Sequence, residues 1–255
     1  MPLPIGRWVP LSRPRRLIAD LMHFAQQVPT VAAERRMSLA PLAAARRACP
    51  RRPSWCVLFA RAFALVAARR PELRRSYMAF PWPHLYEHPE SVAAVTVERT
   101  WDGEEVPIIT HFTSPETSLL ADLDARLRYF QECPLGDISA VRRFNRLIRL
   151  PWPLRRLVWW SALNLNGPSR ARNVGTFGVT SPASHGAGML HLLSPATSTI
   201  HYGLFDADGS LDVRLTFDHR VFDGAPAARA LADLESVLSN EILAEVRGMG
   251  TAAAA

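Results

Sequence analysis

Residues 211–225 read Leu-Asp-Val-Arg-Leu-Thr-Phe-Asp-His-Arg-Val-Phe-Asp-Gly-Ala, and this order predicts a strand that leads into a helix. Apolar and polar residues alternate over 211–217, which is the period of a half-buried strand. Asp223 is placed to cap the helix that follows, with Gly224 in its first turn. His219 therefore lies between the end of a strand and the start of a helix. A side chain there is rigid at its root and can face a cleft, which suits a general base.

Length and composition indicate a globular protein. A chain of 255 residues can bury a sizeable core, and its apolar content of 48% and charged content of 21% are ordinary. No run reaches the roughly 18 apolar residues that a membrane-spanning helix needs. The longest candidate, 56–68, is short and contains Arg61. The amino end is basic and rich in proline, without the apolar segment of a secretory signal, so we expect a cytoplasmic location.

The basic residues exclude several functions. All thirty are arginine, so the chain contains no lysine. Lipoyl, biotinyl and pyridoxal-phosphate groups are carried on a lysine amine, and this chain can therefore hold none of them covalently. The net charge of +7 raises the question of nucleic-acid binding. The arginines are scattered in pairs with few interleaved aromatics, and no nucleic-acid fold motif is present, so we expect no nucleic-acid partner.

Cysteine and histidine spacing does not favour a metal site. Cys49, Cys56 and Cys133 are odd in number and lack the paired spacing of a disulfide framework or a zinc site. His84 and His88 have the spacing of metal ligands, but prolines flank the pair and no third ligand is nearby. We predict a surface loop there and no metal.

The pattern His-x-x-x-Asp-Gly, formed by His219, Asp223 and Gly224, resembles the signature of the chloramphenicol-acetyltransferase-like superfamily. The longer run 218–225, with the strand before it, resembles the catalytic core of the 2-oxo acid dehydrogenase acyltransferases (E2). A structural histidine beside a helix-capping aspartate would give the same six residues. The motif therefore needs support from the rest of the chain.

Further segments resemble the E2 core in the same order along the chain. They are a helix from Arg13, a strand over 28–37, a helix over 54–69 closed by Pro71-Glu72-Leu73, strands 92–99 and 106–109 with the turn Asp102-Gly103, a helix from 114–116, the strand 175–181 (Gly-Thr-Phe-Gly-Val-Thr-Ser), and a hairpin of 199–205 with 211–217. Together the matches cover roughly residues 13–245, which argues against a chance motif.

We therefore predict a single α/β domain with a chloramphenicol-acetyltransferase-like mixed sheet flanked by helices. Residues 1–12 are expected to form an N-terminal arm, 13–245 the E2-like acyltransferase domain, and 246–255 a flexible tail. Segment 136–172 departs from the family, because it contains two helical patterns separated by Pro151-Trp152-Pro153. We expect Asp137 to cap the first of them.

The resemblance implies an acyltransferase that takes an acyl group from a thioester, with an acyl-coenzyme A as the expected substrate. The acceptor, a thiol, alcohol or amine, is not specified by the sequence. By resemblance, His219 would deprotonate the acceptor, and the hydroxyl of Thr180 would stabilise the oxyanion. Ser181 is the alternative hydroxyl if the alignment slips by one residue.

The residues around His219 are implied to support the site. Asp223 would make a structural ion pair with an arginine rather than a catalytic dyad with His219. The candidate partners are Arg13, Arg15, Arg16 and Arg220, among which the sequence does not choose. Arg220 is otherwise expected to be scaffold, and Gly224 to permit a close approach of the backbone.

The family also implies an assembly, a homotrimer or a larger trimer-based particle, in which Thr180 and His219 of different chains form one site. Two other functions are open: a catalytically silent E2-like assembly subunit, and an E2 core served by a lipoyl domain in trans. The presence of both His219 and a hydroxyl at Thr180 favours a catalyst.

The second helical pattern of the unusual segment, 151–165, is apolar around most of its circumference and contains Trp159 and Trp160. A helix of this kind is usually buried in its own domain or in a subunit interface. The alternative is that it borders the acceptor site or rests on a membrane surface, with arginines at the headgroups.

Overall fold

The structure is a computed structural model that describes residues 6–181, 186–190 and 192–252. Its strands are β1 (Thr30–Ser38), β2 (Arg75–Met78), β3 (His84–Glu87), β4 (Val92–Trp101), β5 (Glu104–Thr113), β6 (Phe177–Thr180), β7 (Ser198–Tyr202) and β8 (Ser210–Asp218). Its helices are α1 (Arg13–Ala25), α2 (Ala40–Ala48), α3 (Trp55–Arg69), α4 (Leu120–Glu132), α5 (Ser139–Leu147), α6 (Trp152–Asn164), α7 (Gly167–Val174), α8 (Gly224–Val237) and α9 (Leu243–Ala252).

Six strands form one mixed sheet in the order β1-β8-β7-β6-β4-β5. Strand β6 runs parallel to its two neighbours, β4 and β7, and the other pairs are antiparallel. The predicted turn between β4 and β5 is confirmed: Asp102 and Gly103 both have left-handed φ values, 56° and 78°. The expected mixed sheet is therefore present, with its strands close to the predicted positions.

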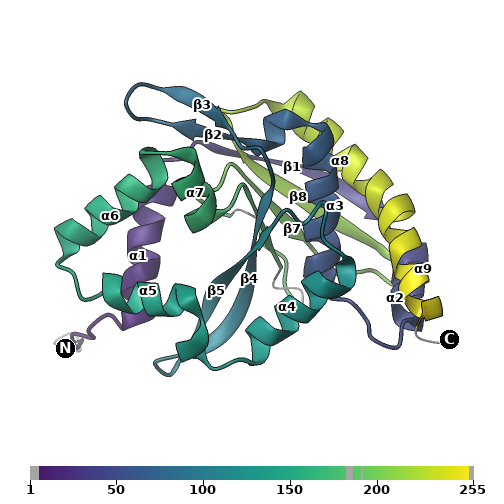
Figure 1. Cartoon of the computed structure of the whole chain (residues 1–255), viewed down its shortest axis with the longest axis horizontal. Coiled ribbons are helices and arrows are strands. Elements are labelled where there is room, and N and C mark those ends of the chain that lie inside the picture. The colour runs from purple at the N-terminus through teal and green to yellow at the C-terminus, as the bar shows by residue number, and fades with distance from the viewer. Residues whose placement is uncertain (1–5, 182–185, 191, 253–255) are drawn as a thin grey trace, which may run out of the picture.

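Helix α3 lies at the centre of the main core. Nine of its fifteen residues are buried, because alanines and large apolar side chains alternate on several sides of it. Phe63 packs edge-on against Phe177 of β6, with 4.9 Å between the ring centroids. Helix α8 packs beside α3, and Figure 1 shows α2, α3, α8 and α9 together on one face of the sheet.

Helices α5, α6 and α7, residues 139–174, form a unit that we call the arch. Figure 1 shows it beside α1, on the far side of the molecule from α2 and α9. A small apolar cluster joins α1 to the arch through Phe24, Trp159, Leu163 and Val174. A buried ion pair, Arg155 to Asp20 at 2.7 Å, joins the same helices. The segment predicted to hold two helices thus holds three.

Several boundaries differ from the prediction. Asp137 does not cap α5, which begins after Ile138 without a side-chain cap. Helix α4 begins at Leu120 rather than near Ser114, because Ser114 has a left-handed φ of 48° that ends the preceding strand in a turn. Helix α9 reaches Ala252 and buries Val246, so the chain is helical through most of the expected tail at 246–255.

The 84–88 segment was expected to be a surface loop, and this prediction is wrong. Strands β2 and β3 pair as a separate two-stranded ribbon. An ion pair between Arg75 and Glu87, at 2.9 Å, links opposite residues of the two strands. Four-residue strands carry too short an alternation to be recognised from the sequence.

Candidate functional site

His219 directly follows the last residue of β8, where the chain turns towards α8. Its backbone N–H donates to the carbonyl of Pro29 at 3.0 Å, which fixes the base of the residue. Its ring lies 5.9 Å from the ring of Phe217, and the side chain is 48% exposed. The predicted position, rigid at the root and open at the tip, is confirmed.

The imidazole of His219 contacts the carboxylate of Asp223, with Nδ1 3.1 Å from Oδ1. An ionised carboxylate can only accept, so the ring tautomer with its proton on Nδ1 suits this contact, and in that tautomer Nε2 has a free lone pair. Asp223 occupies the N-cap position of α8, yet its side chain makes no capping hydrogen bond. Asp223 therefore lacks the capping hydrogen bond, which would contribute about 1 kcal/mol, and its carboxylate contacts the histidine instead.

The ion pair expected between Asp223 and an arginine is not formed within the described part of the chain. The four candidates bind other groups: Arg13 pairs with Asp102, Arg15 with Glu104, and Arg220 with Asp218, while Arg16 donates to the Leu11 carbonyl. The physical reason is burial. Asp218 is fully buried and requires a partner, whereas Asp223 is largely exposed and water can solvate it.

A buried charge cluster supports the turn that carries His219. Asp218 accepts three hydrogen bonds from Arg220, from the backbone N–H at 3.0 Å, from Nε at 2.9 Å and from Nη2 at 2.7 Å. The guanidinium of Arg220 lies 4.1 Å from the ring centroid of Tyr77 in β2. Arg170 of α7 is also buried and donates to two backbone carbonyls, and burial lowers its pKa to about 10. Sequence reasoning missed Arg170 and Tyr77, which come from distant segments.

Gly224 was expected to permit a close backbone approach, but space around it is open. A Cβ built there would meet no heavy atom within 4 Å, so the described chain does not require glycine at this position. Gly178 of β6 is the contrasting case, since its Cβ would meet the side chain of Thr199 at 3.0 Å.

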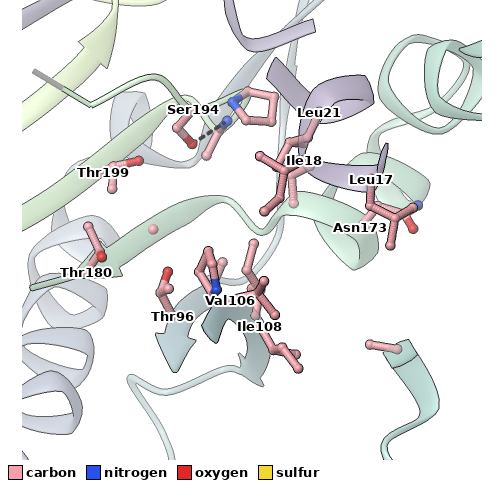
Figure 2. Close-up of a pocket in the computed structure, with 18 of the residues that line it drawn as sticks. Leu17, Ile18, Leu21, Thr96, Val106, Ile108, Asn173, Thr180, Ser194 and Thr199 are labelled. Carbon is pink, nitrogen blue, oxygen red and sulfur yellow. Dashed lines mark hydrogen bonds between the residues drawn. The ribbon is translucent and has the colours of Figure 1, made fainter. Parts of the chain in front are cut away.

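Thr180 is the last residue of β6 and lines a cavity of about 270 Å³, which we call the apolar cavity. Figure 2 shows Thr180 and Thr199 on one side of it and Leu17 and Ile18 of α1 across from them. Ser181, the alternative hydroxyl, donates its Oγ–H to the Tyr202 carbonyl at 2.7 Å. This geometry favours Thr180 over Ser181 as the hydroxyl available to a ligand.

Thr180 and His219 are not brought together within one chain. Thr180 pairs with His201 of β7, which pairs with Arg214 of β8. His219 lies five residues beyond Arg214 (219 − 214 = 5). Five residues along a strand and two strand spacings across the sheet separate the two residues by about 19 Å.

The remaining histidines that the structure describes do not assemble a metal centre. His88 is buried and its Nε2 lies 3.1 Å from the Ser76 hydroxyl, whereas His84 bonds to the Trp82 carbonyl through Nδ1. Burial lowers the pKa of His88 to about 4. Over the described ranges, no group of three or more His, Cys, Asp or Glu residues could hold a metal ion.

Neither a protein-family model nor a curated protein sequence matches the chain. Solved structures do match. The dihydrolipoamide acetyltransferase (E2p) of Azotobacter vinelandii aligns with a TM-score of 0.66 at 18% identity, over 95% of this chain and 99% of that one. The cubic core of a pyruvate dehydrogenase multienzyme complex gives 0.63 at 18% identity, over 95% and 99%. A chloramphenicol acetyltransferase gives 0.51 at 10% identity, over 88% and 94%.

At sequence identities of 10% to 18%, the structural similarity shows a shared fold. The predicted fold class is confirmed: the chain has the mixed α/β fold of the E2 catalytic cores and of chloramphenicol acetyltransferase. These are the proteins that the motif around His219 resembles.

Proposed function

We propose that this chain, which has the fold of the E2 catalytic cores, is an acyltransferase that moves an acyl group from an acyl-coenzyme A to a thiol, alcohol or amine. The observation that carries the proposal is the contact of His219 Nδ1 with the Asp223 carboxylate at 3.1 Å. In the Azotobacter vinelandii enzyme a serine, a histidine and an asparagine four residues later have been investigated for roles in catalysis. His219 and Asp223 have that same spacing.

In the proposed reaction, Nε2 of His219 takes the proton of the acceptor, and the acceptor atom attacks the thioester carbonyl carbon. The carbonyl oxygen becomes an oxyanion, which accepts a hydrogen bond from the Thr180 hydroxyl. Collapse of this intermediate re-forms the carbonyl and breaks the carbon–sulfur bond. The departing coenzyme A thiolate recovers the proton from the imidazolium, so no covalent acyl-enzyme forms and His219 ends neutral.

We further propose that the catalyst is a trimer, or a larger assembly built from trimers. Thr180 and His219 are about 19 Å apart in one chain by the sheet register, too far to act on one carbonyl. Thr180 of one subunit would therefore act with His219 of its neighbour. One matching structure is a cubic core, and the corners of a cube are threefold axes.

Two alternatives are distinguished by one experiment. Purified protein is incubated with a panel of acyl-coenzyme A donors, with dihydrolipoamide and separately with a cell extract, and products are identified by mass spectrometry. The His219→Ala protein is the control. Transfer to dihydrolipoamide would indicate an E2 core served by a lipoyl domain in trans, and transfer to another acceptor a stand-alone enzyme. The absence of any His219-dependent transfer would indicate a silent assembly subunit and overturn the proposal.

We also propose that the arch contacts an anionic membrane surface. Helix α6 is not simply buried as its pattern suggested. Trp159 is 6% exposed, but Leu154 and Leu157 are exposed on the outer side. Segment 138–205 holds eight arginines and no acidic residue. Exposed apolar side chains in a segment that has arginines and no acidic residue suit a bilayer with anionic headgroups. No helix among the described residues is long and apolar enough to cross a membrane.

A further inference from the structure

The apolar cavity is larger than the transfer of a two-carbon acyl group requires. Its volume, about 270 Å³, is close to the lower end of small-molecule sites, roughly 300 Å³. Leu17, Ile18 and Leu21 of α1 face Thr96 and Thr180 of the sheet across it, as Figure 2 shows. A mainly apolar space next to the proposed oxyanion site suits the hydrocarbon part of a substrate.

The arch extends this space. A second cavity, of about 340 Å³, is lined by residues of α5, α6 and α7. Arg143, Phe144, Trp159 and Asn173 line both cavities, so the two adjoin at these side chains. The segment that departs from the E2 pattern therefore builds the end of the apolar cavity.

Two hydrogen-bond donors lie at this junction. One, Trp159, has no acceptor in the described part of the chain, and the other, Arg143, carries an unbalanced charge. The Nε1 of Trp159 is buried without a hydrogen-bond partner there. Arg143 is exposed at the rim and packs against the Phe144 ring at 5.9 Å. Partial burial of the guanidinium lowers the pKa of Arg143, and the nearby cation Arg172 lowers it further. A buried donor without an acceptor and a cation beside a cation are both costly, so an oxygen anion would relieve both.

The pairing of strands β6, β4 and β5 indicates the length of the ligand. Gly178 is paired with Ala94, and Ala94 is paired with His111 of β5, which lines the apolar cavity together with Arg143. Thr180 lies two residues beyond Gly178. Two strand spacings and two residues separate Thr180 from His111 by about 12 Å. An extended chain advances about 1.2 Å per bond, so a chain of about ten carbons spans this distance.

We infer that the substrate carries an apolar chain of about ten carbons, held in the apolar cavity, with an oxygen anion such as a carboxylate at its far end bound by Arg143 and Trp159. The inference rests on the proposed function only for the reacting end of this chain. The chain belongs either to the acyl donor or to the acceptor. Each buried methylene contributes about fourfold in affinity, so binding depends steeply on length.

Binding is tested without catalysis. Linear dicarboxylic acids from succinate to dodecanedioate, and decanoate, are titrated into the full chain with calorimetric detection. We expect affinity to rise to about ten carbons, and decanedioate to bind about tenfold more tightly than decanoate. Arg143→Gln should abolish only this tenfold preference for decanedioate over decanoate. Arg149→Gln removes a cation of the same segment that lines neither cavity, and should leave the preference intact. Failure of decanedioate to bind, or equal binding to wild type and Arg143→Gln, would overturn the anion assignment.

A second variant pair tests the cavity. Ala140→Phe places a ring in the apolar cavity and should weaken the long acids at least tenfold. Ala125→Phe, exposed on α4, is the matched control and should change nothing. Equal binding by both variants would contradict the assignment of the chain to this cavity.

The source of the chain is found by comparing transfer from acetyl- and decanedioyl-coenzyme A with transfer to short and long acceptors. A rate that rises with donor length places the chain in the donor, and one that rises with acceptor length places it in the acceptor. If the acids bind as expected but no donor reacts, the proposed function fails and the cavity assignment stands. If short substrates react and the acids do not bind, the proposed function stands and the cavity assignment fails.

Discussion

Thr180 and His219 lie at opposite ends of one sheet, about 19 Å apart by the register of β6, β7 and β8. The proposed site therefore needs two chains, since the hydroxyl and the base reach one carbonyl only across a subunit boundary. In the proposed trimer, each subunit would contribute Thr180 to one site and His219 to another. Activity and assembly are coupled on this basis, although neither residue is buried in the core.

Replacing His219 with Ala should remove the base and leave the fold intact. The side chain is half exposed and adds little packing. We expect transfer to fall about 100-fold or more, with a melting temperature close to that of wild type. Steady-state rates and a thermal melt check this. Activity within a few-fold of wild type would show that another group is the base.

Thr180→Val should slow the chemical step and leave donor affinity nearly unchanged, because the oxyanion needs the hydroxyl more than the ground state does. A donor of this kind is worth on the order of 3 kcal/mol of barrier. Ser181→Ala is the control, since the Ser181 hydroxyl is bonded to the Tyr202 carbonyl. Single-turnover rates and donor titrations separate the two effects. A collapse of donor binding without a slower chemical step would assign Thr180 another role.

Stability should fall in mild acid through His88. Burial, with help from Arg170 and Arg74, lowers the pKa of His88 from 6.5 to about 4. The unfolded chain binds a proton at pH 5 that the folded chain does not, so acid favours unfolding. This stabilising contribution is present above pH 6.5 and is lost as the pH falls towards 4, with about 2 kcal/mol lost by pH 5.

The check is urea denaturation at pH 7.5 and pH 5. His88→Gln should lower the difference between the two unfolding free energies by about 2 kcal/mol, whereas His84→Gln, half-buried in the last pair of the ribbon, should leave it unchanged. An equal pH dependence in wild type and His88→Gln would mean that His88 does not stay neutral in the folded chain.

The membrane proposal is tested on the outer side of α6. Leu154→Gln with Leu157→Gln should weaken binding to vesicles that contain phosphatidylserine, at unchanged melting temperature, because both side chains are exposed. Leu119→Gln with Tyr129→Gln, exposed on or next to α4, is the matched control. High salt should weaken binding by wild type. Wild type that stays in solution with such vesicles, or a variant that loses its oligomeric state instead, would contradict a membrane role.

The sheet and the position of His219 could be predicted because period-two alternation and a glycine-containing turn act locally. The strand at 211–217 and the turn at Asp102 are examples. The partner of Asp223 could not be predicted, since four arginines were chemically equivalent in sequence. Arg220 pairs with Asp218 and not with Asp223 because Asp218 is fully buried, which is a property of the folded chain.

The arch was the least predictable part. Its α6 pattern is apolar around most of the circumference, so it does not indicate which side is buried. The structure buries Trp159 and leaves Trp160 partly exposed against Phe80, 5.9 Å between ring centroids. The cavity that the arch completes is equally invisible in the sequence, because α1, β4, β5 and β6 build its other walls.

Mixing two inactive variants tests the shared site most directly. His219→Ala and Thr180→Val proteins are unfolded together in equal amounts, refolded, and assayed for acyl transfer beside each variant refolded alone. In a random trimer about one quarter of the sites pair an intact Thr180 with an intact His219. We predict that the mixture recovers about one quarter of the wild-type rate. A mixture no more active than the single variants, while wild type refolds to full activity, would contradict a site shared between subunits.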